Sequence, residues 1–106
     1  MKEFFLKAEQ IQQIIPSGEY CMATDEITVQ GKKVGYMYRQ NPRDKGDSGW
    51  FFLSGSESQE YLDNPNNLAI YDVNTIANYD RDIIPLLDSV VGSQYERKSG
   101  KLVKVL

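Results

Sequence analysis

Aspartate is the residue type in this sequence whose number suggests chemistry. Seven aspartates lie between residues 44 and 88: Asp44, Asp47, Asp63, Asp72, Asp80, Asp82 and Asp88. Clustered carboxylates bind hard cations such as Mg²⁺ and Ca²⁺. The stretch 44–49, however, lacks the alternating ligands and the late glutamate of a calcium-binding loop. Because aspartate readily caps turns and helices, we favour structural turns over a metal site.

Other catalytic arrangements lack an essential partner. The chain has no histidine, so neither a serine nor a cysteine nucleophile has its usual base. Cys21 is the sole cysteine and lies in an apolar run typical of a strand, so we predict a buried side chain and no internal disulfide. Zinc ligands are nearly absent, and no glycine-rich stretch has the lysine and spacing of a phosphate-binding loop. We therefore expect no catalytic residue and no cofactor.

Two alternatives stay open at this point. The first is a metal-dependent enzyme that uses clustered aspartates, in which pairs such as Glu60 with Asp63, or Asp80 with Asp82, act as general acid and base. It requires three or more carboxylates that converge in a cleft and have perturbed pKa values. The second is a structural or regulatory domain of unknown role.

Tyrosine is abundant, with seven copies beside the single Trp50. Tyrosine and tryptophan bury a large area with few rotatable bonds, so they make good protein-binding anchors when exposed. We assign Tyr36 and Phe51 to the core and expect Tyr61 and Tyr71 to be exposed, beside acids that suit a partner rich in Arg or Lys. The candidate partner-binding residues are Trp50, Tyr61, Asp63, Asn64, Tyr71, Asp72, Asn74, Tyr79 and Asp80.

The first half of the chain predicts a helix followed by strands. Apolar residues at helical spacing predict a helix over 8–15, with 4–6 as a separate edge strand in the alternative interpretation. A strand follows at 20–24. Alternation in 27–29 and 34–38 predicts a hairpin about residues 30–32, and Gly35 within it indicates a bulge or a close backbone approach. The apolar run 50–53 predicts a central strand.

The second half predicts short elements separated by strong breaks. A capping box of Ser56 and Gln59 predicts a helix over 57–62, and a short strand follows at 68–71. Asp72 or Asn74 is placed to cap a helical turn through 76–78. Pro85 limits 83–87 to a turn or loop, and 94–97 with 102–106 predict a closing hairpin. The fold class is therefore α+β, with a mainly antiparallel twisted sheet in a single layer packed by helices and loops.

Length and charge bound the remaining possibilities. The 106 residues fit one domain over 1–106. A net charge of −3 argues against a nucleic-acid partner and against adsorption to anionic membranes. No run approaches a membrane span, and the apolar part of the N-terminus is too short for a signal peptide, so we expect a cytoplasmic protein. We expect a monomer or a weak dimer through the edge strand 102–106.

Several ordered motifs are spaced as in a known bacterial family. They include Gly35-Tyr36-Met37-Tyr38-Arg39, Asp47-Ser48-Gly49-Trp50, Tyr61-Leu62-Asp63-Asn64-Pro65, Ile70-Tyr71-Asp72-Val73-Asn74-Thr75-Ile76, Asn78-Tyr79-Asp80 and Tyr95-Glu96-Arg97. Through them, residues 20–97 resemble the bacterial domain of unknown function 2185, also classed as immunity protein 33 of polymorphic toxin systems. The resemblance implies a protein that binds a cognate toxin domain and blocks it sterically, without catalysis.

Overall fold

The computed structural model describes residues 2–16 and 18–105. Its centre is one sheet of six strands in the order β4-β1-β3-β2-β5-β6. The strands are β1 (Tyr20–Thr24), β2 (Tyr36–Arg39), β3 (Asp47–Leu53), β4 (Leu68–Asp72), β5 (Gln94–Lys98) and β6 (Lys101–Val105). Strands β1 and β3 are parallel and every other neighbouring pair is antiparallel. This arrangement confirms the predicted α+β class with a mainly antiparallel sheet.

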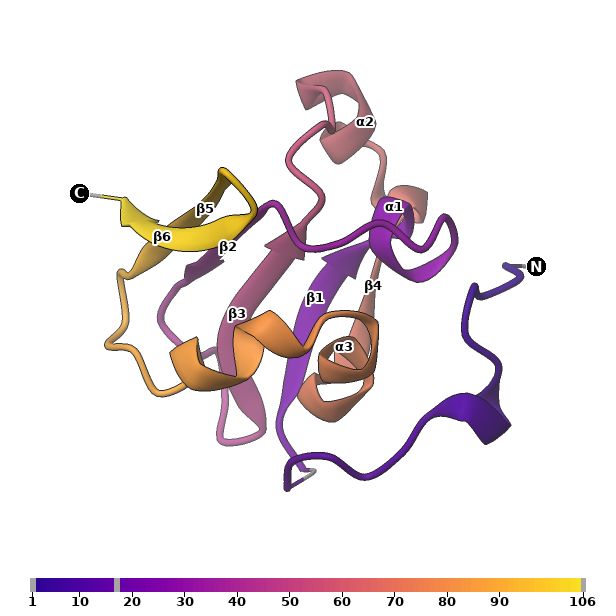
Figure 1. Ribbon diagram of the computed structural model, residues 1–106, viewed down its shortest axis with the longest axis horizontal. Coiled ribbons are helices and arrows are strands. Elements are labelled where there is room, and N and C mark those ends of the chain that lie inside the picture. The colour runs from indigo at the N-terminus through magenta and orange to yellow at the C-terminus, as the bar shows by residue number, and fades with distance from the viewer. Residues whose placement is uncertain (1, 17, 106) are drawn as a thin grey trace.

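The helices are short. Three are α-helices and three are 3₁₀-helices: α1 (Asp25–Thr28), α2 (Gln59–Asp63), α3 (Val73–Tyr79), η1 (Ala8–Gln10), η2 (Pro65–Asn67) and η3 (Arg81–Leu86). Helix α3 and the η3 turn lie over the same side of the sheet, whereas α2 lies beyond the end of β3 (Figure 1). Because none exceeds seven residues, their stability comes from packing rather than from helix propensity.

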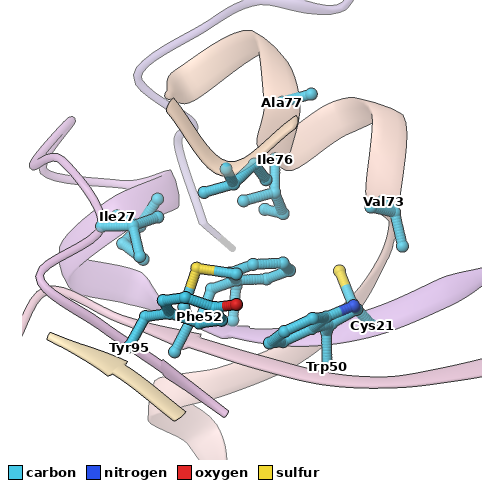
Figure 2. Packing of buried hydrophobic residues seen from close by; sticks show 12 residues of the cluster. Cys21, Ile27, Trp50, Phe52, Val73, Ile76, Ala77 and Tyr95 are labelled. Carbon is cyan, nitrogen blue, oxygen red and sulfur yellow. The ribbon is translucent and has the colours of Figure 1, made fainter. Parts of the chain in front are cut away.

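The core lies between these helices and one face of the sheet, which we call the covered face. The strands contribute Cys21, Ala23, Met37, Trp50, Phe52 and Tyr95 to the cluster, and the helices contribute Ile27, Val73, Ile76, Ala77 and Ile83. Figure 2 shows the two sets of side chains meeting between helix and strand. Cys21 is fully buried, as predicted, and burial raises the pKa of its thiol.

The hairpin predicted over 27–38 is wrong. Residues Asp25–Thr28 form α1, with Asp25 and Glu26 in its first turn, where carboxylates interact favourably with the helix dipole. Ile27 is fully buried against the core, and Gly31, at φ +78°, turns the chain back after the helix. Strand β2 therefore pairs with β3 and β5 instead of with residues 27–29.

The predicted N-terminal helix over 8–15 is also wrong. Only Ala8–Gln10 forms a 3₁₀ turn, and residues 4–6 form no strand. Instead, the backbone N–H groups of Gln12, Ile14 and Ile15 donate hydrogen bonds to asparagine side chains of α3. Helix α2 begins two residues later than predicted, because Ser58, not Ser56, is its N-cap and accepts a hydrogen bond from the Tyr61 N–H at 3.0 Å.

The other predicted elements are confirmed. Strand β3 lies near the middle of the sheet, β4 and the β5–β6 hairpin form, and Asp72 caps α3 by accepting a hydrogen bond from the Asn74 N–H at 2.8 Å. Gly35 marks a close backbone approach, since a Cβ atom there would lie 1.8 Å from the carbonyl oxygen of Ser54. No side chain larger than hydrogen fits between these two segments.

Candidate protein-binding face

The sheet has a second face, on which side chains alternate with those of the core. We call it the open face. Strand register aligns one residue from each strand in a row across it: Ile70, Met22, Phe51, Tyr38, Gln94 and Val105. Among the described residues, none of these six belongs to the core cluster or to the side chains packed against it. Five of the six are apolar or aromatic, which is unusual because a solvated sheet face is normally polar.

The centre of the row is rigid. The rings of Tyr38 and Phe51 stack at a centroid distance of 5.0 Å and an interplanar angle of 12°. Tyr36 lies 5.8 Å from Tyr38, and its hydroxyl donates to Oε1 of Gln94 at 2.9 Å. Burial between these neighbours raises the pKa of Tyr38, with a further contribution from Tyr36. Rings held in this way lose little conformational entropy when a partner covers them.

A groove of about 660 Å³ opens where β2 and β3 meet the loop that leads to α2. Tyr36 and Leu53, which pair across β2 and β3, line one side, and Leu62 of α2 lines another. Glu57 helps to shape the loop, since its carboxylate accepts hydrogen bonds from the Ser54 N–H at 2.8 Å and the Gly55 N–H at 2.9 Å. The groove therefore extends the open face toward α2.

The rim at the other end of β3 is polar. The Tyr20 hydroxyl donates to Oδ2 of Asp44 at 2.9 Å, a bond that raises the pKa of Tyr20, and the Arg43 guanidinium lies 5.8 Å from the centre of the Tyr20 ring. Burial favours the neutral form of Asp47. Hydrogen bonds from the backbone N–H groups of Arg43 and Gly49, together with the Arg43 side chain, outweigh this effect of burial. The pKa of Asp47 therefore lies below its ordinary value. An apolar centre with a polar rim is the usual anatomy of a protein interface.

The structure does not bring the nine predicted partner-binding residues together. Trp50, Asn74 and Asp80 are buried. The Trp50 indole is 1% exposed and donates to the carbonyl oxygen of Leu87 at 3.1 Å. Asp80 accepts hydrogen bonds from the Val34 N–H at 3.0 Å and from Arg97 at 2.6 Å. These three side chains hold the domain together from inside.

Tyr71, Asp72 and Tyr79 are only partly exposed, and they organise α3 and the N-terminal segment. The Tyr71 hydroxyl lies 3.1 Å from the Thr28 hydroxyl, and the Tyr79 hydroxyl donates to the Thr28 carbonyl at 2.9 Å. Asp72 accepts from the Gly18 N–H at 3.2 Å in addition to capping α3. The expected exposure of Tyr71 is thus only partial, because Phe4 packs edge-on against its ring.

Tyr61, Asp63 and Asn64 remain accessible at the α2 end of the groove. Asp63 and Asn64 are exposed and Tyr61 is part-exposed. Burial raises the pKa of Tyr61, as do the carboxylates of Asp25, Glu26 and Glu57 nearby. Leu62 is the α2 residue that lines the groove, and these three residues are its neighbours in the chain.

The residues of the open face were misassigned from the sequence. Tyr36 and Phe51 were expected in the core, yet the structure places both on the opposite side of the sheet from Met37 and Phe52. Successive residues of a strand point to opposite faces, and the run 50–53 is apolar throughout. Both faces carry large apolar side chains, so the pattern does not tell which one the helices cover.

The aspartates of the described residues are not gathered into a metal-binding cluster. Within residues 2–16 and 18–105, no group of three or more His, Cys, Asp or Glu side chains is placed to hold a metal ion. Asp44, Asp72 and Asp80 each accept a backbone N–H two residues further along the chain, as turn and cap residues do. The alternative of a metal site built from clustered aspartates is therefore not favoured. No helix in the described part of the chain is long and apolar enough to span a membrane.

Comparison with known proteins supports the resemblance seen in the motifs. No curated protein and no solved structure gives a significant match. Residues 21–105 match the model of the immunity protein Imm33 domain, a span that includes all six strands except Tyr20, the first residue of β1. On the strength of that match, the chain belongs to the immunity protein Imm33 domain family.

Proposed function

We infer that this protein is an immunity protein that binds a cognate toxin domain in the bacterial cytoplasm and blocks it sterically, without catalysis. Membership of the Imm33 family supports a toxin partner in general terms. The observation that carries the binding mode is the uncovered row of apolar and aromatic side chains across the open face. Ile70 is exposed and the other apolar members of the row are part-exposed, and an apolar stripe with a polar rim is typical of a protein-binding surface.

The open face suits tight binding for two physical reasons. Its anchors are aromatic rings on adjacent central strands, so they are positioned before the partner arrives. Ile70 is 59% exposed at the β4 end of the row and widens the apolar contact. Tyr61, Asp63 and Asn64 extend the surface beyond the groove, where acidic groups complement a partner rich in Arg or Lys.

The experiment is co-expression with toxin domains encoded beside the gene, read out as growth rescue and as co-purification. The wild-type protein should rescue growth and co-purify with one toxin domain. Phe51→Glu places a charge at the centre of the open face and should abolish both effects. The matched control is Val90→Glu, because Val90 is 74% exposed and lies in no strand, outside the row across the open face.

The two levels of this proposal fail separately. If no adjacent toxin is neutralised by the wild-type protein, the immunity function is wrong. If a toxin is neutralised and a folded Phe51→Glu protein still rescues growth, the function stands and the open face is not the contact surface. Circular dichroism of both variants establishes that each is folded before the comparison is made.

A further inference from the structure

The N-terminal segment, residues 2–16, lies outside the matched Imm33 region, and we call it the arm. It runs beside α3 and β4 on the covered side of the molecule (Figure 1). Within its described residues there is a single 3₁₀ turn and no strand that joins the sheet. The arm is held chiefly by side chains of α3 that bind its backbone.

Two asparagines of α3 clamp the second half of the arm. Asn74 donates from Nδ2 to the Gln12 carbonyl at 2.9 Å, and its Oδ1 accepts from the N–H groups of Ile14 at 2.8 Å and Ile15 at 3.0 Å. Asn78 binds Gln12 on both sides, accepting its N–H at 3.0 Å and donating to its carbonyl at 2.9 Å. These contacts recognise peptide groups and not side chains.

The first half of the arm is fixed by its backbone and by apolar packing. The Leu6 N–H donates to the Tyr79 hydroxyl at 3.2 Å, and the Phe5 N–H donates to the Thr28 carbonyl at 2.8 Å. Between arm and domain lies an apolar cavity of about 160 Å³. Its arm side is lined by Phe4, Leu6, Ala8 and Ile11, and its domain side by Tyr71, Thr75 and Tyr79.

The helix itself indicates that these asparagines serve the arm. Asparagine is a weak helix former, yet α3 carries two, one turn apart, within seven residues. Asn74 is 6% exposed, and three of its polar contacts go to the arm. Without an extended chain beside α3, its side-chain amide would lose these three hydrogen bonds, which is costly for a buried group.

We propose that α3 and β4 form a binding site for a peptide that crosses them without joining the sheet, and that the arm is its resident and exchangeable ligand. The site holds the peptide backbone through Asn74 and Asn78, and it selects apolar side chains through the cavity beneath Phe4 and Leu6. Opening the arm leaves every strand pairing of the sheet in place, since the arm contributes none. Detachment of the arm therefore breaks side-chain hydrogen bonds and the packing of Ile15, but no strand pairing.

The test separates arm from domain after the full chain has folded. A site-specific protease sequence is inserted directly after Pro16, and the purified protein is cut. The peptide should remain bound at high concentration and leave on dilution, while the near-UV circular dichroism of the domain persists. A fluorescent peptide of residues 2–16 should then bind saturably, and the unlabelled peptide should displace it.

Variants of the peptide test backbone recognition directly. Methylation of the backbone amide nitrogen of Gln12 removes the N–H group that donates to Asn78. It should weaken peptide binding at least about tenfold, close to 1.4 kcal/mol. Gln12→Ala in the peptide keeps the backbone and should change the affinity less than about twofold. On the domain, Asn78→Ala should weaken binding as much as methylation does, whereas Arg81→Ala, an exposed residue that does not touch the arm, should not.

Three outcomes would overturn the proposal. The first is loss of near-UV circular dichroism once the arm has gone, which would make the arm an integral part of the fold. The second is failure of the cut domain to bind the peptide again. The third is a loss of affinity from Gln12→Ala equal to that from methylation, which would show recognition of the side chain.

Discussion

The two faces of the sheet carry similar residues, but the helices bury one face and leave the other uncovered. Phe51 and Phe52 are adjacent on β3, and alternation sends them to opposite sides. Phe52 is 1% exposed beneath the helices, whereas Phe51 lies on the open face, stacked on Tyr38. The difference shows that the covering helices, not the hydrophobicity of a strand residue, decide whether it stabilises the domain or remains available to a partner.

On the open face, the stacked rings of Tyr38 and Phe51 shield part of each other from water. Cross-strand aromatic pairs of this kind contribute about 0.2–1 kcal/mol each relative to alanine pairs. That is less than full burial of a phenylalanine, at about 1.5–3 kcal/mol. The open face therefore keeps unrealised hydrophobic free energy that a binding partner can recover, and the following changes test how far the two faces divide these roles.

The largest expected effect is on the covered face. Phe52→Ala should lower the free energy of unfolding by about 4 kcal/mol, because it removes a fully buried ring and leaves a cavity. Phe51→Ala should cost only about 1 kcal/mol, since its ring is part-exposed. Urea denaturation measures both. Equal losses for the two variants would remove the distinction between the faces.

The next largest effect concerns the ion pair between Asp80 and Arg97. Asp80→Asn should cost about 3 kcal/mol, because Arg97 loses the buried carboxylate that it contacts at 2.6 Å. Asp82, which contacts the same guanidinium at 3.0 Å, is exposed, so Asp82→Asn should cost less than about 1 kcal/mol. Thermal unfolding of the two variants compares them. A larger loss for Asp82→Asn would assign the structural role to the exposed partner.

A smaller effect in free energy, but a specific one, is expected for binding. Tyr38→Ala should weaken toxin binding by about 2 kcal/mol, roughly 30-fold, because it removes a central anchor of the open face. Tyr38→Phe keeps the stacked ring and should stay within about threefold of the wild-type affinity. Calorimetric titration against the toxin domain measures both. If Tyr38→Ala leaves the affinity unchanged, the toxin contacts another part of the surface.

The smallest effect is the pH dependence set at the polar rim. The pKa of Asp47 is lower in the folded protein than in the unfolded chain, so the ionised form stabilises the fold. That contribution is complete above about pH 4, the unfolded value for aspartate, and is lost as the pH falls through the lower folded pKa. Asp47→Asn should cost about 1 kcal/mol at pH 7. Its urea midpoints between pH 7 and pH 3 should therefore fall less steeply than those of the wild type.

Much of the fold followed from local sequence. Runs typical of strands identified β1, β3 and the β5–β6 hairpin, and Asp72 was recognisable as a cap because its carboxylate meets an N–H two residues away. The close approach at Gly35 followed from a glycine inside a strand. The ordered motifs also identified the family. The strands and the Asp72 cap depend on neighbours a few residues apart, which is the range that a sequence pattern encodes.

The candidate site and two elements depended on contacts between distant segments. Residues 25–28 become a helix because Ile27 is buried in the core, and residues 12–15 form no helix because Asn74 and Asn78 bind their backbone groups. The choice of covered face depends on where α1, α3 and η3 pack. The sequence by itself determined most of the strands, the Asp72 cap and the family. Only the tertiary structure decided which face of the sheet stays open, because both faces are apolar and long-range packing chooses between them.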